Sequence, residues 1–172
     1  SMNKFLIKKK LAESGLNTGG EVFQLHNWDE ARACQYHIPV VIKPSDGSGS
    51  KGVSVVKDKS ELDKAIQYAF DGARNHEIYV EPFILGTEYS VEAYVNDSKV
   101  YIYSIVKTNF KWQGEYPLYV QTTYLDLNDD TENRIEVEVE KAINSLGVQW
   151  GPVNFDVIVS SEDGNPYIID VG

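Results

Sequence analysis

The sequence predicts an α+β fold, in which short antiparallel strands are interrupted by four helices. The first observation behind this prediction is a pair of β-branched runs, 40–42 and 53–56, on either side of a glycine-rich stretch. The second is a set of segments with apolar residues at helical spacing. The third is a pair of late strands, 153–159 and 167–171, that each carry an aspartate among large apolar residues. With 172 residues, the chain is long enough to bury a core of its own.

Composition narrows the class of protein. A hydrophobic fraction of 42% and a charged fraction of 24% are ordinary for a globular domain. The formal net charge of −10 argues against a nucleic-acid partner, because phosphate backbones are bound by basic surfaces. No apolar run approaches the roughly 18 residues that span a membrane, so no membrane partner is expected. The single cysteine, Cys34, excludes an intrachain disulfide and fits a reducing cytoplasm, which is the expected location.

Capping residues and apolar stripes define the helices. They are expected over residues 3–14, 28–36, 60–73 and 129–146. Asn3 is a suitable N-cap for the first helix and Gly15 a suitable stop. The first helix is expected to share one apolar face among Leu6, Ile7 and Leu11. In the last helix the run 135–140 is also compatible with a strand, and Gly147 is expected to end the element.

The remaining segments are read as strands and turns. Further strands are expected over residues 21–25, 77–84, 88–95 and 100–107. Pairing of the second of these should end at Pro82, which has no N–H to donate. Residues 96–99 have the composition of a hairpin turn, whereas 109–118 are expected to form a loop.

The glycine-rich stretch is the strongest indication of a ligand. Glycines allow the backbone to approach a ligand closely, and successive N–H groups in such a loop form an anion-binding concavity. Lys43, at the end of the first strand, and Lys51, in the loop, add positive charge. A polyphosphate is the expected ligand. A flexible hairpin tip without function remains the alternative from the loop alone.

Other glycine motifs fit this stretch less well. Gly47, Gly49 and Gly52 spell G-x-G-x-x-G, but a dinucleotide-binding loop opens a helix and this one precedes a strand. The P-loop pattern fails because Lys51 is followed by glycine, and the kinase strings H-R-D and D-F-G are absent. The pattern therefore favours a flap between two strands that closes over nucleotide phosphates.

Two aspartates indicate a cation site. Asp156 lies in N-F-D-V-I-V and Asp170 in Y-I-I-D-V, on strands expected to be adjacent. Aspartate is a poor strand former and an unpaired buried charge is costly, so a shared divalent cation such as Mg²⁺ would account for both. The alternative is that both side chains point outward from the sheet. Glu81 and Glu88 lie on either side of the segment 82–87. If they are exposed surface residues, they do not indicate a functional site.

Together these segments resemble the ATP-grasp superfamily. The resemblance rests on Asn3-Lys4 in the first helix, V-V-I-K-P with S-D-G-S-G-S-K-G-V, E-P-F-I-L-G-T-E, G-P-V-N-F-D-V and Y-I-I-D-V-G. Their order and spacing match over nearly the whole chain. Within the superfamily, the sequence pattern G-x-x-x-x-D-V of the metal strands is most similar to that of carbamoyl-phosphate-synthase-like and glycinamide-ribonucleotide-synthetase-like ligases. One departure is Gly172, where many members carry an asparagine.

The resemblance implies roles for individual residues. It implies phosphate contacts for Lys4, Lys43, Asp46, Gly47, Ser48, Gly49, Ser50, Lys51 and Gly52. It implies adenine contacts for Glu81, Pro82, Phe83 and Ile84, and a ribose contact for Glu88. Asp156 and Asp170 would bind Mg²⁺ or Mn²⁺, and Lys107 would contact the γ-phosphate or the substrate.

The resemblance also implies the architecture and the activity. It implies an ATP-grasp fold fragment with a leading helix (3–16), a small flap subdomain (17–80, loop 45–52) and a hinge with an antiparallel metal-strand subdomain (81–172), the nucleotide being bound between the last two. The intact protein would be a ligase that uses ATP to activate a small carboxylate as an acyl phosphate for an amine or thiol. Because the family's substrate domain is not recognised, the chain by itself is expected not to catalyse ligation. A non-catalytic ATP-binding module, a phosphotransferase without ligation, and a homodimer remain open.

Overall fold

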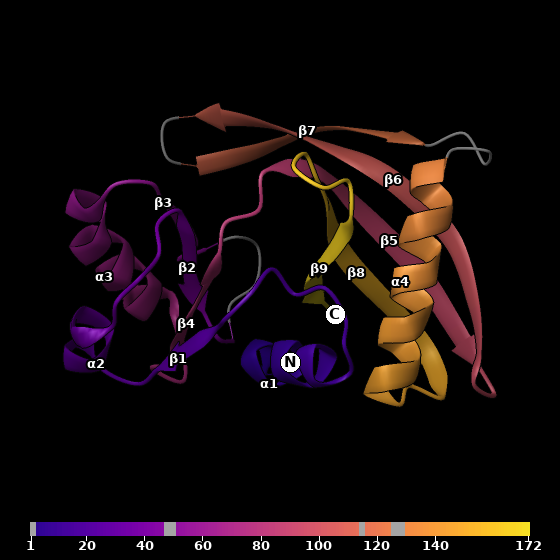
Figure 1. Cartoon of the computed structure of the whole chain (residues 1–172), viewed down its shortest axis with the longest axis horizontal. Coiled ribbons are helices and arrows are strands. Elements are labelled where there is room, and N and C mark those ends of the chain that lie inside the picture. The colour runs from indigo at the N-terminus through magenta and orange to yellow at the C-terminus, as the bar shows by residue number, and fades with distance from the viewer. Residues whose placement is uncertain (1–2, 47–50, 114–115, 125–129) are drawn as a thin grey trace. The chain divides into compact units, whose positions relative to one another are not determined.

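A computed structural model describes residues 3–46, 51–113, 116–124 and 130–172, with side chains described outside 109–129. The chain divides into two compact units, Ser1–Lys8 with Gly19–Phe83, and Lys9–Thr18 with Ile84–Gly172. The sequence prediction put this boundary between residues 80 and 81. Each unit contains its own antiparallel sheet (Figure 1). Over the described ranges, every helix is too short or too polar to cross a bilayer.

The first unit is a four-stranded sheet with two helices. Helix α1 (Lys4–Glu13) contributes its first part to this unit. The other elements are β1 (Phe23–Leu25), α2 (Trp28–Ala33), β2 (Val40–Pro44), β3 (Ser54–Val56), the 3-10 helix η1 (Lys59–Glu61), α3 (Leu62–Gly72) and β4 (Ile78–Pro82). The strand order is β1-β4-β2-β3, and every neighbouring pair is antiparallel.

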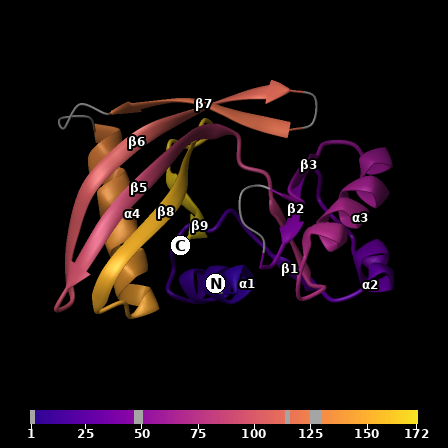
Figure 2. The same cartoon turned by 180° about the vertical axis from the view of Figure 1, so that it is seen from behind.

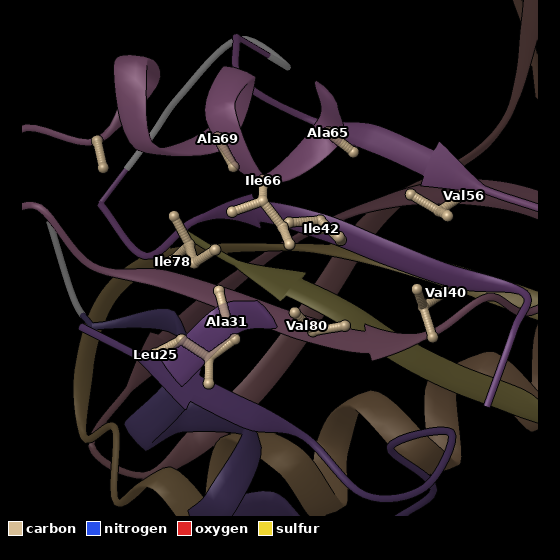
Figure 3. Packing of buried hydrophobic residues seen from close by; sticks show 11 residues of the cluster. Leu25, Ala31, Val40, Ile42, Val56, Ala65, Ile66, Ala69, Ile78 and Val80 are labelled. Atoms are coloured by element: carbon tan, nitrogen blue, oxygen red, sulfur yellow. The ribbon is translucent and has the colours of Figure 1, made fainter. Parts of the chain in front are cut away.

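The core of the first unit lies between this sheet and its helices. Figure 3 shows Ala65, Ile66 and Ala69 of α3 directed toward Ile42 of β2 and Ile78 of β4. The helical stripe expected for α3 is therefore confirmed. The cluster also includes Leu25, Ala31, Val40, Val56, Ala73 and Val80. Because this core occupies one face of the sheet, alternate strand residues must leave on the other face.

The second unit is a five-stranded sheet packed against one long helix. Its elements are β5 (Gly86–Asn96), β6 (Lys99–Gln113), β7 (Tyr116–Tyr124), α4 (Asp130–Leu146), β8 (Trp150–Ser160) and β9 (Pro166–Val171). The strand order is β7-β6-β5-β8-β9. Figures 1 and 2 show α4 lying along one face of β5, β6 and β8. The fully buried Ile135, Val139 and Ile143 confirm the helix over the run 135–140 that also fitted a strand.

Several turns and caps are as the sequence predicts. Asn3 Oδ1 accepts hydrogen bonds from two N–H groups in the first turn of α1. Gly15 has φ +77°, and the N–H of Leu16 reaches back to Leu11 O at 3.1 Å, which closes a glycine C-cap. In the β5–β6 hairpin Asp97 and Ser98 have φ of 50° and 61°, the left-handed conformation that a two-residue turn requires.

Two expectations are wrong. Residues 109–113 and 116–118 of the predicted loop belong instead to strands, because β6 continues to Gln113 and pairs with β7, while 114–115 lie outside the described residues. Pro117 is compatible with this assignment, because β7 is the edge strand of its sheet, where proline is tolerated. Leu6 does not share the buried face of α1, since its exposed fraction is 59% against 0% for Leu11.

Candidate functional site

A charged cluster lies on the face of the first sheet opposite α3. In β4, Ile78 and Val80 belong to the core. Strand residues alternate in direction, so Tyr79 and Glu81 leave the sheet on the other face. Lys43 of β2 pairs directly with Tyr79 and is the diagonal neighbour of Glu81, so it leaves on that face too. The sheet register therefore brings the predicted phosphate lysine beside a predicted adenine-contact residue.

Glu81 contacts two ammonium groups at once. The Nζ of Lys8, in α1, lies 3.0 Å from Oε2, while the Nζ of Lys43 contacts Oε1. The Lys43 ammonium also lies 4.9 Å from the centroid of the Tyr79 ring. The side chains of Lys8 and Glu81 are each 3% exposed, and that of Lys43 is 10% exposed. Buried charges are costly unless they are paired, which this arrangement achieves within the chain.

Electrostatics keep this cluster ionised. Burial alone would raise the pKa of Glu81, but the charges of Lys43 and Lys8 outweigh it and the pKa is lowered. Burial alone would lower the pKa of Lys43, but the Glu81 carboxylate and Tyr79 outweigh it and the pKa is raised. Two ammonium groups and one carboxylate give the cluster one net positive charge. It therefore suits an anion.

The ends of the glycine-rich loop are fixed by packing and hydrogen bonds. The N–H of Arg74 donates to Asp46 Oδ1 at 3.1 Å, and the Arg74 guanidinium donates to Asp46 O at 2.8 Å. Gly52 has φ +79°, and a Cβ there would lie 2.6 Å from the Cγ of Pro44. Lys51 is exposed beside it. The predicted phosphate-binding residues Gly47, Ser48, Gly49 and Ser50 lie outside the described residues.

The predicted adenine hinge follows β4. Pairing of that strand ends at Pro82, as the sequence predicts, although the strand was expected to continue to residue 84. The N–H of Phe83 donates to Pro39 O at 3.1 Å, and Lys57 Nζ lies 5.6 Å from the centroid of the Phe83 ring. The Phe83 N–H is thus engaged within the first unit, whereas Ile84 begins the second. Adenine contacts by these residues remain a prediction.

The two predicted metal aspartates lie opposite each other in the second sheet. Asp156 of β8 pairs with Asp170 of β9, and both side chains are partly buried. Strict alternation would put Ile168 on the same face as Asp170. The register shifts by one residue between Asp156 and Val157, and this β-bulge lets Ile168 stay in the core while Asp170 faces Asp156.

Glu88 and Lys107 leave this sheet on different faces. Ser90 is opposite Asp156, and Glu88 lies two residues from Ser90, so Glu88 is on the face of the aspartates. Lys107 instead pairs with Tyr89, whose buried side chain belongs to the core face. The structure therefore groups Glu88 with the two aspartates and separates Lys107 from them. A γ-phosphate or substrate contact by Lys107 remains a prediction.

Helix α1 carries one functional candidate that sequence reasoning selected and one that it missed. Lys4 lies in the first turn and is partly buried. Lys8, one turn later, is the residue that contacts Glu81. The signal for Lys8 was its place beside Ile7 and three residues before Leu11, on the buried face of the helix. A lysine within an apolar stripe requires a buried counter-charge.

The facing aspartates fit a cation of the Mg²⁺ class. Mg²⁺ and Mn²⁺ prefer oxygen ligands, and Mg²⁺ is commonly held by one or two carboxylates together with phosphates and water. Within the described ranges no group of three or more His, Cys, Asp and Glu side chains could hold a metal ion. The two carboxylates of Asp156 and Asp170 suit a cation that takes its other ligands from a phosphate and water.

These features define a class of protein, an α+β domain with a candidate anion site on one sheet and a candidate cation site on the other. A family model described as the ATP-grasp domain matches residues 1–172, so the chain belongs to the ATP-grasp family. Structures of that family share its two antiparallel sheets. The predicted family and α+β fold class are therefore confirmed.

Named relatives of this chain include ligases. It is 31% identical to D-alanine–D-alanine ligase B of Xanthomonas campestris pv. campestris, over 99% of this chain and 55% of the relative. It is 24% identical to dapdiamide A synthase of Enterobacter agglomerans, over 99% and 41% of the two chains. The crystal structure of L-amino acid ligase from Bacillus licheniformis superposes with a TM-score of 0.77 at 27% identity, over 99% and 39%. The chain thus spans about half the length of the curated relatives it matches, and its subgroup within the family remains a prediction.

Proposed function

We propose that this chain is the Mg-ATP-binding domain of an ATP-dependent ligase that joins a carboxylate to an amine or thiol. The ATP-grasp match over the whole chain carries the proposal. The named ligases among its relatives support the reaction class. Those relatives include ligases of D-alanine and of L-amino acids, so we propose an amino acid as the carboxylate substrate.

In this proposal the first unit binds the phosphates. Lys43 suits that role, because the register of β2 and β4 places its ammonium beside the Tyr79 ring in a cluster with one net positive charge. Lys4 and the loop from Asp46 to Gly52 would add further phosphate contacts. The backbone of residues 82–84 would meet the adenine base.

The second unit would contribute the cation and ribose contacts. Asp156 and Asp170 would hold Mg²⁺, which when bound neutralises charge on the transferred phosphoryl group. Glu88, on the same face, would accept hydrogen bonds from the ribose hydroxyls. Transfer of the γ-phosphoryl group to a substrate carboxylate would give an acyl phosphate and ADP, and the amine or thiol would then displace phosphate.

Nucleotide binding is tested by thermal unfolding and calorimetry. Millimolar Mg-ATP should raise the melting temperature, because a ligand at 100 times its Kd stabilises the native state by about 2.7 kcal/mol. Lys43→Ala should weaken ATP much more than adenosine, since only the phosphates lose a partner. Lys59→Ala, an exposed lysine of η1, serves as the control. Equal weakening of ATP and adenosine by Lys43→Ala would remove the phosphate role.

The acyl phosphate is tested by trapping. The protein is incubated with Mg-ATP, hydroxylamine and single amino acids, and the hydroxamates are identified by mass spectrometry. A hydroxamate that depends on both ATP and one amino acid would establish the intermediate and name the carboxylate. ATP binding without any trapped product would limit this chain to the nucleotide-binding step.

A further inference from the structure

The buried cluster of the first unit contains one carboxylate and two lysines, and the lysines use different oxygens. Lys8 contacts Oε2 of Glu81 and Lys43 contacts Oε1. Neither lysine therefore has to displace the other. If Lys43 moves, the contact between Lys8 and Glu81 at 3.0 Å can remain as it is. All three residues belong to the same unit of the chain.

A phosphate bound near Lys43 would compete with Glu81 for its ammonium group. The Lys43 side chain is 10% exposed, and the residue is the last but one of β2, just before the glycine-rich loop. A polyphosphate bound there would attract the ammonium away from the carboxylate. Without a second cation, Glu81 would then be a buried and uncompensated charge, which is among the costliest states in a protein interior.

We propose that Lys8 is a positioning residue of the nucleotide site, which keeps Glu81 neutralised while Lys43 transfers from Glu81 to a phosphate of the bound nucleotide. The inference rests on the proposed nucleotide binding and extends it. One carboxylate then serves two lysines, holding Lys43 in place when no phosphate is bound and staying with Lys8 afterwards. The Glu81 side chain acts as a counter-ion, and the adenine base is met by the backbone that follows it.

The rigid attachment of Lys8 supports this role. It projects from the second turn of α1, flanked on the buried face by Ile7 and Leu11, whose exposed fractions are 7% and 0%. A lysine that only balanced charge could sit on a solvated loop. This one is 3% exposed, so its position is set by packing and it cannot follow Lys43 to the phosphate.

The test is a cycle of variants measured by calorimetry with Mg-ATP, ADP and adenosine. Lys8→Met should raise the Kd of Mg-ATP roughly tenfold or more, because phosphate binding then leaves the buried Glu81 carboxylate without a counter-ion. It should leave the Kd of adenosine unchanged, because adenosine does not draw Lys43 away. The double variant Lys8→Met with Glu81→Gln should bind Mg-ATP as Glu81→Gln alone does, because it has no carboxylate at position 81 that could lose its counter-ion. Lys9→Met, an exposed neighbour on the same helix, should bind all three ligands as the unaltered chain does.

Two results would overturn the inference while leaving the proposed function intact. One is equal weakening of Mg-ATP and adenosine by Lys8→Met, and the other is failure of Glu81→Gln to restore the loss. If the unaltered chain binds neither ATP nor adenosine, the proposed function fails and the inference falls with it. If Lys8→Met does not fold, two other variants test the role. Lys8→Arg keeps the positive charge and must show the same ratio of ATP to adenosine affinity as the unaltered chain. The double variant must bind Mg-ATP with the same Kd as Glu81→Gln. Departure from either would reject the role of Lys8.

Discussion

Glu81 and Asp156 are both acidic residues within strands, yet the charged residues near them are of opposite kinds. Glu81 is 3% exposed and contacts the ammonium groups of Lys8 and Lys43. Asp156 is partly buried and lies directly opposite a second carboxylate, Asp170. The first carboxylate contacts opposite charges of its own chain, and the second has another acidic residue directly opposite it on the neighbouring strand.

Under the proposed function, this difference would distinguish a site whose charges are paired within the chain from a site to which a bound cation adds charge. In the first unit, ion pairing positions Lys43 without any phosphate, so the fold itself maintains the geometry. In the second unit, two like charges directly opposite each other are unfavourable, and a cation would reverse the sign of that interaction. We therefore expect changes at the first site to appear in folding stability, and changes at the second in metal-dependent binding.

The largest effect is expected for Glu81→Ala. It leaves two buried ammonium groups without their carboxylate, and breaking a buried ion pair in this way costs about 3–5 kcal/mol. Urea denaturation measures this as a decrease in the free energy of unfolding. Glu21→Ala removes an exposed glutamate of the same unit and should change that free energy by less than about 0.5 kcal/mol. Equal effects of the two substitutions would show that the cluster does not stabilise the fold.

A smaller loss is expected for Gly52→Ala. The alanine would have to adopt φ near +79° and would place its Cβ 2.6 Å from Pro44 Cγ, so about 2–4 kcal/mol of strain and overpacking is expected. Gly147→Ala is the matched control, because its φ is +73° but no atom lies within 4 Å of the added Cβ. That control should lose about 1–2 kcal/mol from the backbone alone. If both variants lose the same amount in urea denaturation, the contact with Pro44 does not constrain the loop.

Much of this fold follows from local sequence rules. Asn27 caps α2 by accepting from the Glu30 N–H at 2.9 Å, and Gly147 ends α4 with φ +73°. Asparagine and glycine at these positions have strong conformational preferences, so helix caps and turns can be predicted from a single sequence. The facing aspartates were predicted on the same grounds, from their unfavourable strand context.

The features that were missed depend on tertiary partners. Lys8 acquires its role only because β4 brings Glu81 to the face that α1 covers within the first unit. The bulge beside Asp170 exists because Ile168 and Val171 must both reach the core. The ion pair of Lys8 and the bulge in β9 both depend on packing between elements, and the periodicity of a single segment does not contain that information.

Acid should weaken the first site. The pKa of Glu81 is lowered in the folded state, so the unfolded state binds more protons as pH falls. Its contribution to stability is therefore present above the unfolded carboxyl pKa, near 4.5, and is lost as pH falls through the folded value. Below pH 4.5 the free energy of unfolding should fall more steeply than in Glu81→Gln, by up to about 1.4 kcal/mol per pH unit. Parallel pH profiles for the two proteins would contradict the lowered pKa.

The smallest effect on stability, with the largest on cation binding, is expected for Asp156→Asn. The substitution keeps the shape of the side chain but removes one of two like charges that face each other across β8 and β9. Because the Asp156 side chain is only partly buried, the free energy of unfolding should change by no more than about 1 kcal/mol. ATP binding should lose its dependence on Mg²⁺, because one of the two carboxylate ligands is gone.

Asp97→Asn, at the exposed hairpin turn, is the control and should retain that dependence. Urea denaturation and calorimetry with and without Mg²⁺ measure both quantities on the same samples. A loss of stability as large as that of Glu81→Ala, with Mg²⁺ dependence intact, would show that Asp156 is a structural residue and that the contrast between the two sites is wrong.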